Sequence, residues 1–167
     1  MNARDENIIG GQQLDELLQT LPGKLQRNVN RSALRAGAAA LLPEVVQRIP
    51  VDSGDLRASA RITTRARGAT VSASVKVGNR VAWYAHLVEY GTRPHVIKPR
   101  EPGGALQFGG VTTKSVQHPG TRPQPFMRPA IDSSLPQVVA AVTAKIRERL
   151  TRQGLDAPEA LPGDPEQ

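Results

Sequence analysis

The sequence predicts an α+β domain: a small twisted antiparallel sheet packed by a long N-terminal helix and a C-terminal helix, with a long extended loop or hairpin. Three observations lead to this fold class. Two segments space their apolar residues as amphipathic helices do. Between them, two segments rich in β-branched residues are separated by a short turn, and a long segment studded with Gly and Pro follows.

The long N-terminal helix is expected from about Leu25 to Ile49, because apolar residues recur there at every third or fourth position. Pro43 lies inside this pattern, and we expect a kink between Ala39 and Pro43 because proline has no amide donor and crowds the preceding turn. A shorter helix is expected from Gln12 to Thr20. The apolar positions of the long helix are Leu34, Ala38, Leu41, Leu42, Val45, Val46 and Ile49.

The sheet is expected to be a hairpin of two strands, from Ser59 to Arg65 and from Thr70 to Val77, since both segments are rich in Val, Ile and Thr. Between the long helix and this hairpin, Asp52 or Ser53 is expected to cap a brief turn from Gly54 to Arg57. Asp52, Ser53 and Asp55 could also form an acidic metal loop, but short polar residues before a turn are more often caps that satisfy free backbone donors.

The segment between Pro94 and Pro125 contains three short pieces that resemble strands, at His95 to Ile97, Ala105 to Phe108 and Val111 to Val116. The closing helix is expected from Ile131 to Arg152, with Leu135, Val138, Val139, Val142 and Ile146 at helical spacing. We therefore divide the chain into an N-terminal arm with a short helix (1–24), an α+β domain (25–152) and a flexible acidic, proline-rich tail (153–167).

Charge and composition narrow the range of functions. The chain has 22 Lys and Arg against 15 Asp and Glu, a formal net charge of +7. Four of these acids lie beyond Arg152, the last basic residue, so the preceding part is strongly basic and must either meet an acidic partner or tolerate self-repulsion. Cysteine is absent, which excludes disulfides and cysteine nucleophiles. We expect a soluble protein without a membrane span or a standard export signal.

Two histidines suggest a chemical site. His86 and Glu89 lie three residues apart on an expected short helix, and with His95 they could form a metal or acid–base site. Two histidines without a third spaced ligand are more often surface or packing residues, so we expect no catalysis and no metal here. A small hydrolase using His86, Glu89 or Asp52 stays open as a rival.

Arginines cluster on and around the expected hairpin, where several could share one face and contact phosphates. Aromatic residues that would stack on single-stranded bases are missing, so sequence-specific nucleic-acid recognition is not expected. Non-specific proximity to DNA stays open. These arginines are Arg57, Arg61, Arg65, Arg67, Arg80, Arg93 and Arg100.

Three motifs follow one another along the chain: "VDSGDLRASA", then "YAHLVEYGT" about thirty residues later, then "HPGTRPQPFMRPA" before the closing helix. In this order, over roughly Leu34 to Leu150, the sequence resembles the tail-completion and head-tail joining proteins of long-tailed phages, the family that includes lambda minor tail protein Z. The resemblance implies a structural virion protein of the phage neck or tail end, without cofactor or turnover.

Each motif residue is expected to support the fold. Gly54 permits the reversal from helix to sheet, and Leu56 anchors it. On the short helix, Tyr84, Ala85, Val88 and Tyr90 should bury one face, Glu89 should hold free amides of the turn, and Gly91 should end the helix in a left-handed cap. Phe126 should enter the core, with Pro129 in the first turn of the last helix. The expected structural residues are Gly54, Leu56, Tyr84, Glu89, Tyr90, Gly91, Phe126 and Pro129.

The resemblance also implies partners. It implies a homo-oligomeric ring, sixfold to match the tail or twelvefold to match the portal, that contacts tail terminator or tail tube proteins on one side and head-completion or connector proteins on the other. The ring would surround the DNA channel in the virion, after assembly in the host cytoplasm. The alternative is a basic DNA-associated protein outside a virion ring. The expected subunit or neck interface comprises His95, Ile97, Leu106, Phe108, Val111 and His118.

Overall fold

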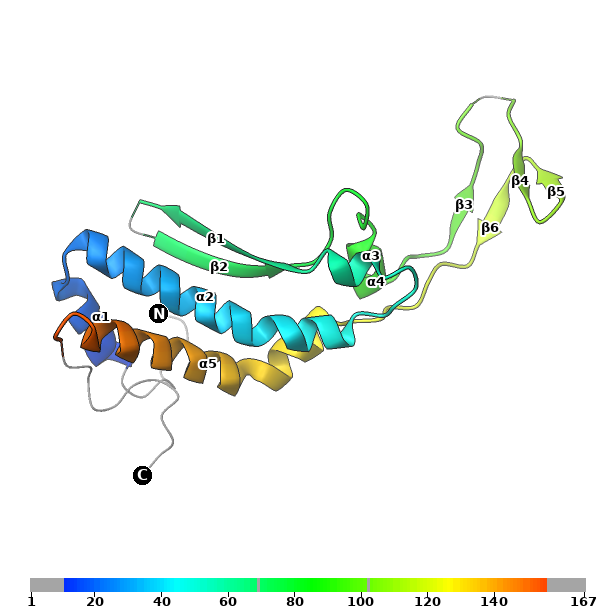
Figure 1. Ribbon diagram of the computed structural model, residues 1–167. Helices are drawn as coiled ribbons and strands as arrows, with labels where there is room; N and C mark the ends of the chain where they lie inside the picture. Colours follow the sequence, from blue (N-terminus) through cyan, green and yellow to red (C-terminus); the bar gives the residue numbers. More distant parts are fainter. Residues whose placement is uncertain (1–10, 69, 102, 156–167) are drawn as a thin grey trace. The chain divides into compact units, whose positions relative to one another are not determined.

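A computed structural model of the chain describes residues 11–68, 70–101 and 103–155 (Figure 1). They form two compact units: one joins the chain up to Val77 with the chain from Phe126 onward, and the other comprises Gly78–Pro125. The expected α+β class is confirmed by a long N-terminal helix, a C-terminal helix and small antiparallel sheets. Residues 1–10 of the expected N-terminal arm and 156–167 of the expected tail lie outside the described residues.

The first unit begins with helices α1 (Gly11–Thr20) and α2 (Gly23–Arg48), close to the predicted bounds. Helix α2 ends at Arg48 because Ile49 precedes a proline and takes extended backbone angles, with φ −65° and ψ 123°. Pro43 lies inside α2 as expected. The kink expected near it stays a prediction.

Strands β1 (Arg61–Arg67) and β2 (Thr70–Lys76) form the predicted antiparallel hairpin. The first strand starts two residues later than expected, because the Ser59 amide and hydroxyl bond back to the Leu56 carbonyl at 3.2 and 2.6 Å. These bonds close the short helix α3 (Asp55–Ala58).

The expected cap of this turn is correct only in part, because Ser53 accepts one free amide of the turn but is not the N-cap residue of α3. Gly54 itself is the N-cap residue of α3, with a left-handed φ of 88° that a side chain would disfavour. Ser53 instead braces the turn from outside, since its hydroxyl accepts the Asp55 amide at 3.3 Å and donates to the Asp55 carboxylate at 2.6 Å. Leu56 is buried, as expected.

Helix α5 (Met127–Thr151) starts four residues earlier than predicted. Phe126 is its N-cap residue and only 1% exposed, and Pro129 lies in the first turn, where a missing amide costs no helical hydrogen bond. Leu135, expected in the apolar stripe, is 56% exposed. The buried face instead runs through positions four apart, such as 130, 134, 146 and 150, which leaves Leu135 one position off the face.

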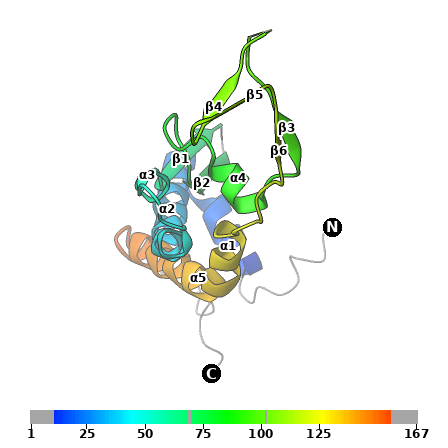
Figure 2. The same cartoon turned by 90° about the vertical axis from the view of Figure 1, so that its right-hand side faces the viewer.

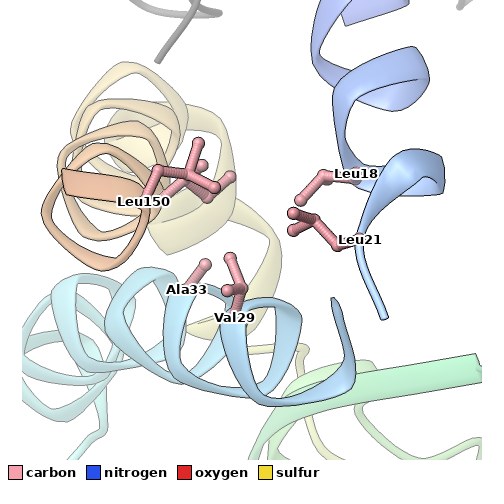
Figure 3. Packing of buried hydrophobic residues seen from close by; sticks show 6 residues of the cluster. Leu18, Leu21, Val29, Ala33 and Leu150 are labelled. Atoms are coloured by element: carbon pink, nitrogen blue, oxygen red, sulfur yellow. The ribbon is translucent and has the colours of Figure 1, made fainter. Parts of the chain in front are cut away.

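Helix α2 lies between the hairpin and α5, and contacts both (Figures 1 and 2). Close approach of the two helices depends on Gly37 in α2, because a Cβ there would lie 2.6 Å from Val142 Cγ2 and 3.3 Å from Val138 Cγ1. At one end, α1 joins α2 and α5 in a single apolar cluster (Figure 3). The cluster comprises Leu18, Leu21, Val29, Ala33, Ile146 and Leu150.

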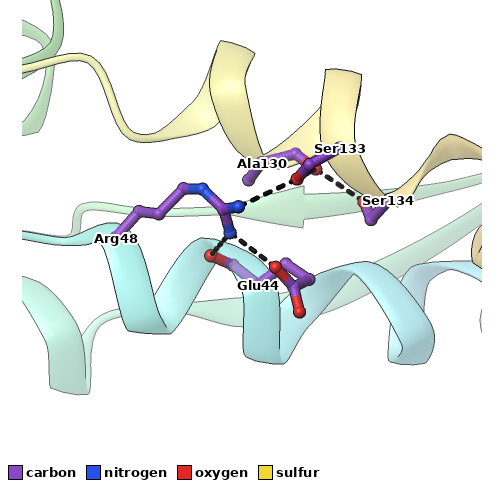
Figure 4. A network of polar contacts seen from close by, with 5 residues as sticks. All are labelled: Glu44, Arg48, Ala130, Ser133 and Ser134. Atoms are coloured by element: carbon purple, nitrogen blue, oxygen red, sulfur yellow. Dashed lines mark hydrogen bonds and ion pairs between the residues drawn. The ribbon is translucent and has the colours of Figure 1, made fainter.

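A polar contact links the other end of the helix pair (Figure 4). The Arg48 guanidinium donates to the Glu44 carbonyl at 3.0 Å and pairs with its carboxylate at 2.5 Å, and it also donates to Ser133 Oγ of α5 at 2.9 Å. Farther along α5, the ammonium of Lys145 bonds the Glu148 carboxylate at 2.6 Å, which lowers the pKa of Glu148.

Among its described residues, the second unit contains one short helix and four short strands. Helix α4 is Ala85–Tyr90, and the strands are β3 (His95–Ile97), β4 (Leu106–Phe108), β5 (Val111–Thr113) and β6 (Val116–His118). The strands pair as β3 with β6 and β4 with β5, both antiparallel. The β4–β5 hairpin is therefore nested between β3 and β6.

Candidate assembly surface

The segment from residue 92 to residue 121, here called the ribbon, contains the two pairs of short strands and is closed at its base by an isolated bridge between Thr92 and Thr121. The strand expected at His95 to Ile97 is confirmed, and that at Ala105 to Phe108 loses one residue. The piece expected from Val111 to Val116 is divided between β5 and β6. A turn divides it because Thr113 Oγ1 donates to the Ser115 carbonyl at 2.9 Å and accepts its amide at 3.4 Å.

The base of the ribbon is closed by backbone pairing. Thr92 and Thr121 exchange two hydrogen bonds, of 2.9 and 3.1 Å, and the Gln124 amide bonds the Val88 carbonyl of α4 at 2.9 Å. At Gly91 and at Gly120 the two segments at the base of the ribbon approach so closely that only glycine fits. A Cβ at Gly91 would lie 2.5 Å from the Thr121 carbonyl oxygen, and one at Gly120 would collide with the Thr92 carbonyl oxygen.

Gly91 corrects the expectation of a left-handed helix cap. Its φ of 70° is positive as expected, but its ψ is −177°, so the residue leaves α4 in an extended direction rather than the left-handed helical one. This region of backbone angles is open essentially to glycine alone. Gly91 therefore ends α4 and directs the following residues into the ribbon.

The ribbon carries all six residues expected at an interface, and cross-strand pairing places each of them opposite another residue of the ribbon. His95 faces His118, Ile97 faces Val116, and Leu106 faces Thr113. Phe108 pairs with Val111 through the backbone, and its side chain lies outside the described part. The sequence signal that located these residues was apolar or aromatic character inside a segment otherwise rich in Gly and Pro.

The ribbon exposes apolar surface and open strand edges. Val96, Ile97 and Val111 are 44%, 38% and 58% exposed. Each sheet has two strands, so every strand in the described ribbon has one edge whose backbone groups pair with no further strand. Two-stranded ribbons are marginally stable in water, and open edges accept further strands.

Two histidines are stacked across the β3–β6 pair. The rings of His95 and His118 lie 5.0 Å apart between centroids. The Gly120 amide donates to His118 Nδ1 at 3.0 Å, so this nitrogen carries the lone pair, whereas His95 Nδ1 donates to the Arg93 carbonyl at 2.9 Å. His118 therefore acts as a brace for the Gly120 turn at the base of the ribbon.

A second set of exposed side chains lies at the two ends of α4. Trp83 is 64% exposed and contacts Tyr84 edge to face, and Tyr90 is 78% exposed. The expected burial of Tyr90 is wrong, because the last residue of so short a helix points off the face that holds Ala85 and Glu89. Ala85 and Glu89 are buried and Tyr84 is half-buried.

His86, Glu89 and Asp52 form no cluster of metal ligands in the described part of the chain. His86 is exposed and its Nδ1 donates to the Trp83 carbonyl at 3.1 Å, a contact within one turn of chain. Within residues 11–155, apart from the two gaps, no group of three or more His, Asp or Glu side chains could hold a metal ion. Among the described helices, none has the length and apolar character needed to cross a membrane.

Sequence reasoning missed two glycines that the structure makes important. Gly120 stands inside the quoted motif "HPGTRPQPFMRPA" but was given no role, and Gly37 stands in the run "RAGAAA". A signal was present for Gly37: a glycine four residues after Ala33 on the same helical face marks close helix packing. For Gly120 the signal was a glycine directly after a proline, which indicates a tight turn.

The structure defines an α+β chain with a helix pair, a hairpin and a ribbon of short paired strands that exposes apolar side chains. Residues 12–91, just under half of the chain, match the family model described as "Bacteriophage HK97-gp10, putative tail-component". The relation to a phage tail-component family that the motifs predicted is thus confirmed over this stretch, and it supports a structural phage tail protein found in the virion. No curated protein and no solved structure matched the chain in two further comparisons.

Proposed function

We propose that this chain is a structural component of the phage neck or tail end, where copies form a ring that completes the tail and joins it to the head around the DNA channel. The ribbon is the observation that carries this proposal. It presents open strand edges and exposed apolar side chains, which are the features that neighbouring subunits use for strand addition and burial.

Ring formation would proceed by strand pairing between copies. In a ring, the same ribbon meets the same receiving surface on the next subunit, a heterologous contact that closes when the rotation fits. Sixfold closure matches the symmetry implied for the tail, and twelvefold closure is the alternative set by the portal. Tail terminator or tail tube proteins and head-completion or connector proteins would occupy the two sides of the ring.

The mechanism requires no cofactor and no turnover. His86, Glu89 and Asp52, the residues considered for a hydrolase, would then serve packing and turn geometry. We expect His86→Ala and His95→Ala particles to assemble, with a partial loss for His95→Ala if its contact with His118 supports the ribbon. A defined enzymatic activity that disappears in either variant while assembly persists would overturn the structural function.

The test is complementation of a phage that lacks this chain. Wild-type chain should restore joined particles, whereas a chain with Val96→Asp and Val111→Asp should fold but leave heads and tails apart, because two exposed apolar contacts become charged. A matched control is Thr112→Asp with Gln117→Asp, two exposed polar positions of the same ribbon. Equal complementation by both variants would contradict a role for the ribbon.

A further inference from the structure

One face of the β1–β2 hairpin carries only basic and hydroxyl side chains. Residues directly opposite in an antiparallel pair point to the same side, and successive residues alternate. The register pairs Arg61 with Lys76, Thr63 with Ser74, Arg65 with Ser72, and Arg67 with Thr70. We call this set the basic face: Arg61, Thr63, Arg65, Arg67, Thr70, Ser72, Ser74 and Lys76.

The opposite face is the one that the fold uses. Ile62, Val71 and Val75 on it are half-buried, and both strands contact α2. The basic face consequently points away from α2, and all its members except the half-buried Thr63 are exposed. A seven-residue strand makes this face about 20 Å long.

The two strands that form the basic face contain no acidic residue. The sequence from residue 61 to residue 76 contains four basic residues and no Asp or Glu. Arg61 bonds the Ser59 carbonyl at 3.0 Å. The side chains of Arg65, Arg67 and Lys76 have no hydrogen bond or ion pair to any described residue, so their cationic groups are available to an external anion.

We propose that the basic face binds the phosphate backbone of double-stranded DNA without reading its sequence. This proposal deepens the proposed function and rests on it, because that function is what places the basic face at a DNA channel. Guanidinium and ammonium groups pair with phosphates, and Ser and Thr hydroxyls donate to phosphate oxygens. A duplex presents one negative charge per about 1.7 Å of axis, so a face about 20 Å long meets about twelve charges.

The side chains favour duplex DNA over the other polyanions. Protein interfaces depend on buried aromatic and apolar anchors, and the basic face contains none. Single-stranded nucleic acid is held largely by stacking on aromatic rings, which are also absent from it. Cations with interspersed hydroxyls and nothing else are typical of contacts that position a duplex.

The test measures binding of the full chain to a short mixed-sequence duplex as a function of salt, by fluorescence anisotropy. Three or four phosphate contacts predict a loss of affinity of about a hundredfold between about 50 and 200 mM salt. Arg65→Gln with Arg67→Gln should lower the salt slope by about two and weaken binding at low salt about tenfold or more. Melting curves should not change, since both side chains are exposed.

The control is Arg80→Gln with Arg100→Gln, which removes the same charge at exposed sites of the second unit. An equal loss of DNA affinity in both variants would show that binding follows net charge, and it would overturn the assignment of binding to the basic face. Tighter binding of polyglutamate than of DNA, lost in the Arg65 and Arg67 variant, would assign the face to an acidic protein and overturn the proposal. If the chain binds DNA as expected but is absent from phage particles, the proposed function is contradicted and the DNA-binding proposal is not.

Discussion

Thr92 and Thr121 are joined by two backbone hydrogen bonds, at 2.9 Å from the Thr92 amide to the Thr121 carbonyl and at 3.1 Å in the reverse direction. This pair closes the base of the ribbon, and Gly91 and Gly120 stand directly beside it. Thr92 lies three residues before β3, and Thr121 lies three residues after β6. Because a side chain at Gly91 or Gly120 would collide with the opposite segment, both glycines are needed for this pairing at the base of the ribbon.

Gly91→Ala should destabilise the ribbon by about 1–3 kcal/mol, because the new Cβ would lie 2.5 Å from the Thr121 carbonyl oxygen and the backbone angles suit glycine alone. Gly103→Ala is the matched control, with a φ of 82° and no atom within 4 Å of the added Cβ. Hydrogen exchange of the β3 and β6 amides measures the effect. Equal losses of protection in the two variants would show that backbone strain alone acts, without the close crossing.

Gly37→Ala tests the helix pair of the first unit. Alanine in a helix is normally better than glycine by about 1 kcal/mol, but here we expect a net loss of about 1–3 kcal/mol in the free energy of unfolding. The reason is the 2.6 Å approach to Val142 Cγ2, and Val142→Ala in the same chain should recover most of the loss. Gly23→Ala, with nothing within 4 Å, should cause no loss. Stabilisation by Gly37→Ala alone would mean that α2 and α5 are farther apart.

Phe126 and Tyr90 make a contrasting pair of aromatic residues. Phe126→Ala should lower the free energy of unfolding by about 3–5 kcal/mol, since its ring is 1% exposed. Tyr90→Ala should change it by less than about 0.5 kcal/mol, since Tyr90 is 78% exposed. Urea unfolding of both variants measures this difference. Similar values for the two would contradict the placement of Phe126 in the core.

Much of the fold could be predicted because apolar spacing and chain-breaking residues are local signals. Helix α2 ended where Pro50 constrains Ile49, and the hairpin followed its β-branched residues. Leu135 was misplaced because the stripe was read in sequence alone, and the face of α5 that packs is set by where Gly37 lets α2 approach. A helix can present several apolar stripes, and only its partner selects one.

The candidate site was predicted by residue type but not by architecture. His95 and His118 were both expected at an interface, but their pairing across β3 and β6 depends on a nested hairpin that no short window of sequence encodes. Tyr90 was expected on one buried face of the short helix with Tyr84, Ala85 and Val88, whereas the buried residues of α4 are Ala85 and Glu89 and Tyr90 is exposed. The kink near Pro43 stays a prediction.

Ordering of the ribbon should accompany assembly. Ordering a residue costs about 1–2 kcal/mol of backbone entropy, and three-residue strands with exposed side chains offset little of it. Amides of Leu106 to Val116 should therefore exchange quickly in dilute monomer and slowly in the ring. The α2 amides near Val45, which is fully buried, supply the internal control and should be slow in both. Slow exchange of the ribbon in the monomer, unchanged on assembly, would show that it is ordered beforehand.

Electron cryomicroscopy of particles that carry this chain tests the central claim most directly. A structural component of the neck or tail end predicts a closed ring at the head-proximal end of the tail, into whose subunits the α2–α5 pair and the ribbon can be fitted, with each ribbon against the next subunit. Fully joined, infectious particles in which mass spectrometry and the density both lack the chain would contradict it.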